Sequence, residues 1–382
     1  MKRVGLVGGG VIGSSIAYYL TQYDAIKTYL FEKAQIGSGT SAKSAGTVCL
    51  LDDSLPEAFF NVRVLALRTY LEMEKESHGS AGFKRTGTLV VCPTEGIRRF
   101  VLNAIEMSRK NGFAAEYLDD PAKIKRIVPD INTEGLLGAG YTTEDGYVDA
   151  TQISVTYANK ARQRGAEILT RTKVNKILRA GNHVTGVETD AGNFDLDIVV
   201  NAAGPWAHYV NQSVSLDLPL MHTKANVFIL KPTSPFGYEL PILKYPRFYT
   251  KPETGRVFAC RAHLTMDLSK SQDAGLFDPD ALPLTGGTDP SFLEFLVNEF
   301  STCFPKLAET GVTNSWLGYR METKDYLPIV GDSPIAGYLL AVGAGGNGVI
   351  LAPTIGQMLA KYIGTGEKDQ LLDTFGYSRL KT

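Results

Sequence analysis

Three glycines near the start of the chain have the spacing of a phosphate-binding turn. Gly8, Gly10 and Gly13 form a G-x-G-x-x-G pattern directly after Arg3 to Val7, an apolar run of the length of a buried strand. In such a pattern the first glycine allows a tight turn, the second lets the backbone approach a pyrophosphate, and the third lets the next helix pack closely. The N–H groups at the start of that helix then face the phosphates.

An acidic residue lies where a ribose would be bound. Glu32 ends a second apolar strand and follows Gly13 by nineteen residues, with a helical segment, Ser14 to Gln22, between them. Its carboxylate can accept ribose hydroxyls, which favours FAD or NAD over NADP. We therefore predict a dinucleotide site rather than a plain turn, without a choice between FAD and NAD. The residues expected to contact the dinucleotide are Gly8, Gly10, Val11, Ile12, Gly13, Glu32 and Lys33.

Small and hydroxylated residues dominate the next segment, Lys33 to Thr47. Such a segment presents backbone N–H groups and hydroxyls at close range, which suits a polar ligand lying along it. The alternative is a flexible surface loop; we favour the ligand because the segment directly follows the ribose-binding strand. The expected ligand-lining residues are Thr40, Ser41, Lys43, Ser44, Ala45, Gly46 and Thr47.

A third candidate contact follows the apolar strand Ile198 to Val200, which runs into Asn201-Ala202-Ala203-Gly204-Pro205-Trp206. The backbone there could approach a cofactor, with Ala203, Gly204 and Trp206 as the contacts. An ordinary strand-to-helix turn explains the pattern equally well.

A second glycine turn lies far along the chain. The strand Tyr338 to Val342 leads into Gly343 to Gly348 and then into a helix, Val349 to Ile363. A second helix N-terminus could stabilise negative charge on the same ligand. A reduced flavin is anionic at its N1–C2=O edge, whereas a nicotinamide dehydrogenase usually needs only the first turn, so the pair of turns favours FAD. The expected contacts are Gly345, Gly346, Asn347, Gly348, Val349 and Ile350.

Length and composition indicate a globular enzyme of two domains. The chain has 382 residues, 44% of them hydrophobic and 21% charged, with a net charge of −1 and no basic block, which argues against nucleic acid as a partner. The four cysteines are scattered, so neither a disulfide framework nor a metal site is expected. No apolar run reaches spanning length, and we expect a cytoplasmic protein, with peripheral membrane association left open.

Patterns between the glycine turns predict further elements. Leu55 to Ser77 has apolar residues near helical spacing, and Gly82 to Val91 has the pattern of a hairpin. Val174 to Leu178 and Val184 to Thr189 predict a meander around Gly181-Asn182. Leu218 to about Thr313 is rich in strand signals, which indicates a second domain.

With these motifs in place, the sequence resembles the D-amino-acid-oxidase-like flavoproteins, within them the branch of glycine oxidase, sarcosine oxidase and the proline dehydrogenase β-subunit. The similarity covers nearly the whole chain. Its most specific part is Ser315-Trp316-Leu317-Gly318-Tyr319-Arg320, followed by Thr323-Lys324-Asp325 and Leu327-Pro328-Ile329-Val330-Gly331. Ser41 to Gly46 and Val200 to Ala207 match two further family motifs.

The resemblance implies an α/β fold. A Rossmann-like FAD-binding domain of the glutathione-reductase type would be combined with an α+β substrate domain built on a mixed or antiparallel sheet. We expect the FAD domain over 1–80, 145–215 and 315–382, and the substrate domain over 81–144 and 216–314. The resemblance also implies a backbone contact from Val174 to adenine.

The implied reaction is oxidation of the carbon–nitrogen bond of an α-amino acid of the glycine, sarcosine, proline or D-amino acid type. Hydride passes to flavin N5, and the imine hydrolyses. Arg320 falls on the family's carboxylate-binding arginine, and Tyr249 is the tyrosine expected beside it, with Tyr245 and Tyr319 as alternatives. A planar guanidinium suits a carboxylate because it donates two parallel hydrogen bonds. The alternative for Arg320 is a surface salt bridge with Glu322 or Asp325.

The sequence departs from its relatives at Gly318. Monomeric sarcosine oxidases carry a flavin-linking cysteine before the T-x-D triplet, where this chain has Gly318 and no cysteine, so the FAD is expected to be non-covalent. Oxygen or another acceptor could take the electrons. Two other functions remain open: oxidation of a 2-hydroxy acid or polyol on the same fold, and a flavin subunit that needs a partner. A homo- or hetero-oligomer is possible.

Overall fold

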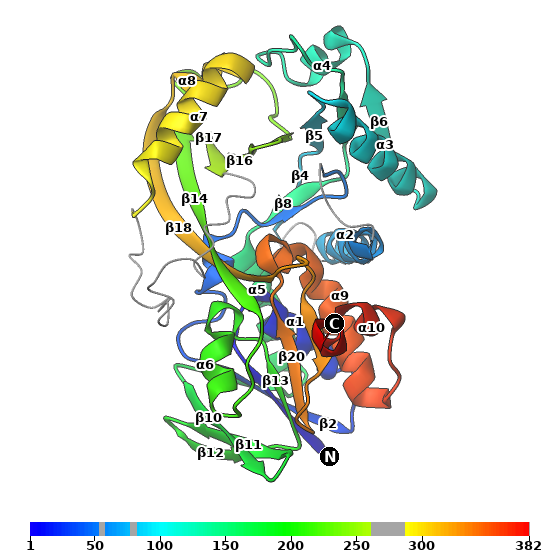
Figure 1. The fold of residues 1–382 in the computed structure, drawn as a ribbon, viewed down its shortest axis with the longest axis vertical. Coiled ribbons are helices and arrows are strands. Elements are labelled where there is room, and N and C mark those ends of the chain that lie inside the picture. Colours follow the sequence, from blue (N-terminus) through cyan, green and yellow to red (C-terminus); the bar gives the residue numbers. More distant parts are fainter. Residues whose placement is uncertain (53–57, 77–81, 261–286, 382) are drawn as a thin grey trace.

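The structure is a computed structural model that describes residues 1–52, 58–76, 82–260 and 287–381. Two large sheets organise the chain, one of six strands in the lower half of Figure 1 and one of eight strands in the upper half. Helix α2 (Ala58–Glu76) lies between the two halves. It confirms the central part of the helix predicted over Leu55 to Ser77, whose first three residues and last residue lie outside the described residues.

The first sheet confirms the predicted beginning of the chain. β1 (Lys2–Val7), α1 (Val11–Leu20) and β2 (Ile26–Glu32) form a strand–helix–strand unit with parallel strands. The strand order is β19-β20-β13-β1-β2-β9, parallel throughout except for β19, so strands from both ends of the chain lie in one sheet. The remaining strands are β9 (Glu167–Thr170), β13 (Ile198–Asn201), β19 (Ile329–Asp332) and β20 (Tyr338–Val342).

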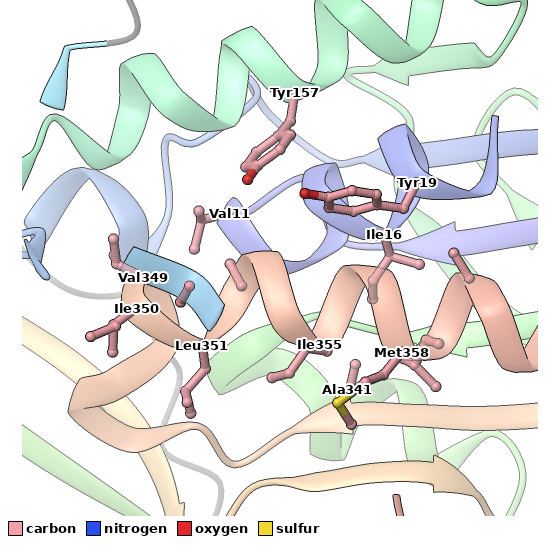
Figure 2. Packing of buried hydrophobic residues seen from close by; sticks show 14 of the residues in the cluster. Val11, Ile16, Tyr19, Tyr157, Ala341, Val349, Ile350, Leu351, Ile355 and Met358 are labelled. Atoms are coloured by element: carbon pink, nitrogen blue, oxygen red, sulfur yellow. The ribbon is translucent and has the colours of Figure 1, made fainter. Parts of the chain in front are cut away.

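Helices α9 (Gly348–Thr365) and α5 (Ala150–Gln163) pack against α1 beside this sheet. Figure 2 shows Val11 and Ile16 of α1 close to the row of apolar side chains on α9, with Tyr157 of α5 above Tyr19. The hydroxyl of Ser15 donates to the Ala352 carbonyl at 2.8 Å, and a Cβ at Gly356 would overlap that hydroxyl. Glycine is thus required for the close approach of α1 and α9.

Two small sheets flank this core. β10 (Val174–Ala180), β11 (His183–Thr189) and β12 (Gly192–Asp195) form an antiparallel meander, which confirms the predicted turn at Gly181-Asn182. The other small sheet consists of β3 (Thr47–Val48), β8 (Gly146–Val148) and β4 (Phe83–Arg85).

The eight-stranded sheet has the order β18-β14-β17-β16-β15-β5-β7-β6 and is antiparallel except between β5 and β15. With the parallel first sheet, it confirms the predicted mixed α/β fold class. The strands are β5 (Thr88–Val91), β6 (Ala115–Leu118), β7 (Ala139–Thr142), β14 (Leu220–Lys231), β15 (Ile242–Tyr245), β16 (Phe248–Glu253), β17 (Arg256–Cys260) and β18 (Gly311–Thr323).

The two faces of this second sheet have different neighbours. One face is apolar and packs against α7 (Pro290–Cys303) and α8 (Pro305–Ala308). The opposite face, here called the inner face, contacts the Lys33–Thr47 segment: Ala45 packs with Val227 and Phe258, and the indole of Trp316 donates to the Lys43 carbonyl at 3.2 Å. The remaining helices are α3 (Glu95–Lys110), α4 (Pro121–Ile127), α6 (Ala207–Gln212) and α10 (Gln370–Phe375).

The hairpin predicted over Gly82 to Val91 is wrong. β4 pairs with β8 and β5 pairs with β7 and β15, so the two strands belong to different sheets. The N–H groups of Thr86 and Gly87 both donate to the Asp145 carbonyl, at 3.2 and 2.8 Å, instead of closing a turn between the strands. A distant carbonyl therefore replaces the local hydrogen bond that a hairpin needs. Further along, β18 lies across the domain boundary expected at 314/315, and the domain division remains a prediction.

Candidate functional site

The first glycine turn is held by contacts between backbone atoms. Gly8 has φ +108°, and a Cβ there would lie 2.6 Å from the Ala202 carbonyl oxygen. A Cβ at Gly13 would overlap the Gly8 carbonyl oxygen. Both positions therefore require glycine for the fold itself, because β1, β13 and the start of α1 meet there.

Gly10 is different, because the fold does not require glycine at this position. Its φ and ψ of −71° and −179° suit any residue, and among the described residues only the Ser41 hydroxyl would lie within 4 Å of an added Cβ, at 3.4 Å. The missing side chain leaves open space at the N-terminus of α1, beside the Ser41 hydroxyl that accepts the Val11 N–H at 3.1 Å. This space is what a pyrophosphate needs, and the turn therefore fits FAD.

Glu32 lies beside the same turn at the end of β2. Its two carboxylate oxygens accept the N–H groups of Gly9 at 2.7 Å and Ala34 at 2.8 Å. These bonds orient the carboxylate, and each oxygen keeps a second lone pair with which to accept a ribose hydroxyl.

The segment that contains the predicted serines connects the two sheets. Thr40 to Lys43 form a short 3₁₀ helix; the Thr40 hydroxyl donates to the Tyr319 carbonyl at 3.0 Å. Gly46 has φ +68°, and a Cβ there would overlap the Val148 carbonyl oxygen. Ser44 accepts the Gly46 N–H at 3.0 Å, and Thr47 begins β3. The described residues therefore hold this segment between the two sheets, and its role in lining a ligand stays a prediction.

The residues after β13 lie against the same end of the first sheet. Ala202 contacts Gly8, and Gly204 has φ +53° with no atom of the described part of the chain within 4 Å of an added Cβ. The Lys33 ammonium lies 4.1 Å from the centre of the Trp206 ring. Among the described residues the buried Trp206 Nε1 has no hydrogen-bond partner, which leaves a donor for a ligand. Val174 shares an apolar cluster with Phe31 and Ala203, so it too lies on this side.

The second glycine turn lies next to the first. Ile12 lies beside Gly348, Ser15 beside Ala352 and Gly356, and so α1 and α9 run parallel with their N-termini together. Gly345 to Asn347 form a 3₁₀ turn that leads into α9. The side chains of Val349 and Ile350 are buried in the core, as Figure 2 shows, so only their backbone can face a ligand. Two positive helix ends thus point to one region, as the prediction requires.

Arg320 projects from the inner face onto this second turn. Its Nε donates to the Thr223 hydroxyl at 2.9 Å, and a Cβ added at Gly346 would lie 2.5 Å from Nη1. Its side chain is 19% exposed, and Nε lies 3.9 Å from Glu322 Oε2. The ion pair with Glu322 considered as an alternative is therefore present, but it is mostly buried rather than on the surface. Asp325 pairs instead with Arg379, at 2.9 Å.

Tyr249 occupies the same face as Arg320. It lies opposite Cys260 in the sheet, and burial raises its pKa well above the usual value, with a smaller contribution from the Cys260 thiol; the Arg320 guanidinium opposes the shift. The phenol is therefore protonated at neutral pH and can donate a hydrogen bond. Tyr245 lies in the outer apolar cluster, and Tyr319 alternates with Arg320 along β18, so neither alternative shares this face.

Gly318, two residues before Arg320, stands over the Lys43 carbonyl, which would lie 3.7 Å from an added Cβ. The structure therefore brings the predicted glycines, the serine segment and Arg320 to one region.

A buried charged group that was not predicted from the sequence lies beside the second turn. The Arg63 guanidinium of α2 donates to Asp52 at 3.2 Å and to Asn347 Oδ1 at 2.9 Å, and the Lys244 ammonium donates to the same Asp52 oxygen at 2.8 Å. One signal was available, since Arg63 lies one helical turn from both Phe59 and Leu67 on the apolar face of α2. Asp52 and Lys244 gave no comparable signal.

Several known proteins with similar sequences are much longer than this chain. The chain is 29% identical over 381 residues to a 4-methylaminobutanoate oxidase (formaldehyde-forming) of Paenarthrobacter nicotinovorans, with 95% of the chain and 44% of that protein covered. It is 26% identical to the mitochondrial sarcosine dehydrogenase of Homo sapiens, with 96% and 40% covered. The chain thus spans less than half the length of these relatives.

Solved structures of similar fold match over the full length. The L-proline dehydrogenase of P. horikoshii has a TM-score of 0.85 at 24% identity, with 100% of this chain and 98% of that chain covered. Glycine oxidase from Geobacillus kaustophilus has a TM-score of 0.81 at 24% identity, with 99% of each chain covered. At this identity the likeness establishes the fold.

Within the described residues no helix is long and apolar enough to cross a membrane, and no group of three or more histidine, cysteine, aspartate or glutamate side chains could hold a metal ion. The family described as FAD dependent oxidoreductase, DAO, matches residues 3–362, and the chain therefore belongs to this family of FAD-dependent enzymes.

Proposed function

We propose that the protein oxidises the carbon–nitrogen bond of a primary or secondary α-amino acid of the glycine, sarcosine, proline or D-amino acid type. The observation that carries this proposal is the position of Arg320, directly over the second glycine turn and on the same sheet face as Tyr249. Proteins with similar sequences or folds include sarcosine dehydrogenase, glycine oxidase and proline dehydrogenase.

FAD, when bound, would accept the hydride from the substrate α-carbon at flavin N5. The residues proposed to hold it are those predicted from the sequence: the glycine turns, Glu32, the segment from Thr40 to Thr47, Val174 and the turn from Ala203 to Trp206. The N-termini of α1 and α9 would face its negative charges. Burial raises the pKa of the Cys49 thiol to about 12 and that of Cys260 to about 11, so these thiols are not ionised, in keeping with non-covalent FAD.

Arg320 and Tyr249 would bind the substrate carboxylate. The Arg320 Nε is committed to Thr223, which orients the guanidinium and leaves its two Nη groups to donate in parallel to a carboxylate. The protonated Tyr249 phenol would add a third donor. The amine enters neutral, so hydride transfer requires no dedicated base, and the imine product then hydrolyses in water.

The test is anaerobic reduction of the yellow holoprotein by amino acids, N-methyl amino acids and 2-hydroxy acids. Arg320→Leu should weaken binding of the reducing amino acid by about 2 kcal/mol, the order of a lost charged hydrogen bond, while FAD stays bound. Arg247→Leu is the matched control, because Arg247 is an exposed arginine in the turn between β15 and β16 and pairs with Glu299.

Three outcomes would contradict the proposal. Reduction by 2-hydroxy acids alone would select a C–OH donor. A holoprotein that no compound reduces would indicate a flavin subunit that needs a partner. Unchanged amino acid affinity in Arg320→Leu would remove Arg320 from the site. A separate measurement, acid precipitation, should release all of the flavin into the supernatant, and flavin retained in the pellet would show a covalent link.

A further inference from the structure

Glu322 is a buried acidic side chain beside the arginine proposed to bind the substrate. It follows Arg320 by two residues on β18, so both side chains project from the inner face. The residue is 4% exposed, and its Oε2 lies 3.9 Å from Arg320 Nε. Within the described part of the chain Glu322 is the acidic group paired with Arg320, whereas Asp325 pairs with Arg379.

The second glycine turn makes room for both members of this pair. A Cβ added at Gly345 would lie 2.8 Å from Glu322 Oε2, and one added at Gly346 would lie 2.5 Å from Arg320 Nη1. An isolated β-bridge between Glu322 and Ala344 holds β18 against the turn. The two charged groups therefore lie against consecutive glycines, at the turn proposed to face FAD.

The pair is poorly suited to a purely structural role. Burying an ion pair costs desolvation free energy, which is offset only when hydrogen bonds satisfy the remaining polar atoms. Arg320 Nε donates to the Thr223 hydroxyl rather than to Glu322, and the buried Glu322 Oε1 has no hydrogen-bond partner among the described residues. The main contribution of this carboxylate is therefore its negative charge beside Arg320.

That charge affects what Arg320 can bind. Opposite charges at this distance attract each other strongly in a mostly buried site, because little water screens them. Thr223 and Glu322 lie at the Nε edge of the guanidinium, which leaves the Nη groups for a ligand carboxylate. A carboxylate bound there would share the positive charge of Arg320 with Glu322 and would be repelled by Glu322. The pair should therefore hold a carboxylate less tightly than an unpaired arginine would.

We propose that Glu322 is a resident counter-ion of Arg320 that lowers the affinity of the site for carboxylates. The inference rests on the proposed function, in which Arg320 binds the carboxylate of the substrate. Oxidation of the carbon–nitrogen bond leaves a product that still carries this carboxylate, so a site that binds carboxylates too tightly would retain its product. Glu322 acts through the charge of Arg320 rather than by contact with the substrate.

The test is binding of acetate, a carboxylate with no amine to oxidise, to the oxidised holoprotein, measured from the change in flavin absorbance. Glu322→Gln removes the charge and keeps the shape of the side chain, so acetate should bind about tenfold more tightly. A purely structural role predicts weaker binding instead. Glu322→Asp keeps the charge and should stay within about threefold of the unaltered protein. Asp325→Asn is the matched control, because Asp325 pairs with Arg379, and its acetate affinity should not change.

A second background tests whether the effect passes through Arg320. Arg320→Leu should bind acetate weakly, and adding Glu322→Gln should change that affinity by less than about twofold, because the charge on which Glu322 acts is gone. Glu322→Met has similar length and no charge, and it takes the place of the glutamine variant, with the same expected result, if that variant does not fold.

The proposal is overturned if neither uncharged variant binds acetate more tightly than the unaltered protein, or if Glu322→Gln tightens binding equally in the Arg320→Leu background. In both cases the proposed function can still stand, because Arg320→Leu alone would bind acetate weakly. Equal binding of acetate by Arg320→Leu and the unaltered protein would instead remove Arg320 from the site, which overturns both the proposed role of Arg320 and this inference.

Discussion

The two glycine turns begin neighbouring parallel helices, yet they are held by different kinds of contact. Gly8 and Gly13 are fixed by backbone atoms of their own strand–helix unit and of Ala202. The second turn is held by side chains from distant segments: Arg63 on Asn347, Arg320 over Gly346 and Glu322 over Gly345. At Gly8 and Gly13 the first turn therefore depends on the absence of side chains, although Glu32 and Ser41 also accept its N–H groups, whereas at Gly345, Gly346 and Asn347 the second turn is contacted by particular side chains. Substitutions in the two turns should therefore change different properties of the protein.

The largest effect is expected from Gly13→Val. The new side chain would overlap the Gly8 carbonyl oxygen, and a backbone group cannot move aside without separating α1 from β1. We expect the free energy of unfolding of the apoprotein to fall by about 3 kcal/mol, with loss of FAD binding. Urea unfolding measures the first quantity. A variant with normal stability would show that backbone packing does not define this turn.

Gly10→Ala should separate cofactor binding from stability within the same turn. Of the residues that the structure describes, the added methyl group meets only the Ser41 hydroxyl, so the free energy of unfolding in urea should change by less than about 1 kcal/mol. FAD affinity should nevertheless fall by about tenfold, because the methyl group enters the space left for the pyrophosphate. Normal FAD affinity would place the pyrophosphate elsewhere.

Gly346→Ala tests the second turn in the opposite way. Its Cβ would lie 2.5 Å from Arg320 Nη1, and a guanidinium can shift where a backbone carbonyl cannot. The variant should fold and keep its FAD, while its affinity for the reducing amino acid falls by about fivefold as the guanidinium is displaced. Anaerobic titration of the flavin absorbance measures both quantities. Loss of FAD with unchanged affinity for the amino acid would contradict this prediction for the second turn.

The smallest effect is expected from a substitution of Asp325, which follows Arg320 in the chain. Burial disfavours the charge of the Asp325 carboxylate, but hydrogen bonds from Arg379, Thr323 and the Leu327 N–H lower its pKa to about 2. Because this pKa lies below the unfolded value of about 3.9, the stabilisation is present above pH 4 and is lost as the pH falls toward 2.

Asp325→Asn should therefore cost on the order of 1 kcal/mol at pH 7, after allowance for solvent screening of a carboxylate that is 43% exposed. The difference between the two proteins should disappear near pH 2. Urea unfolding at several pH values measures it, and a constant difference down to pH 2 would contradict the assignment. Asp119→Asn, at an exposed pair with Lys123, is the control.

The same contrast explains which parts of the molecule could be predicted. The first strand–helix–strand unit was predicted to within a few residues, because its contacts are local and its glycines are needed for the backbone. The hairpin over Gly82 to Val91 was wrong because Asp145, nearly sixty residues away, supplies the hydrogen bonds. Arg63 and Asn347 are separated by 284 residues, and Lys244 and Asp52 by 192, so no local pattern could pair them.

The order of the first sheet has a consequence for how the protein is made. β13 pairs with β1 on one side and with β20 on the other, and α9 covers α1. While the ribosome has not yet released Tyr338 to Thr365, the nascent chain has an unpaired strand edge and a bare apolar helix surface. Such surfaces bind chaperones and other chains readily. A ligand bound by both glycine turns can therefore be captured only after Tyr338 to Thr365 have been synthesised.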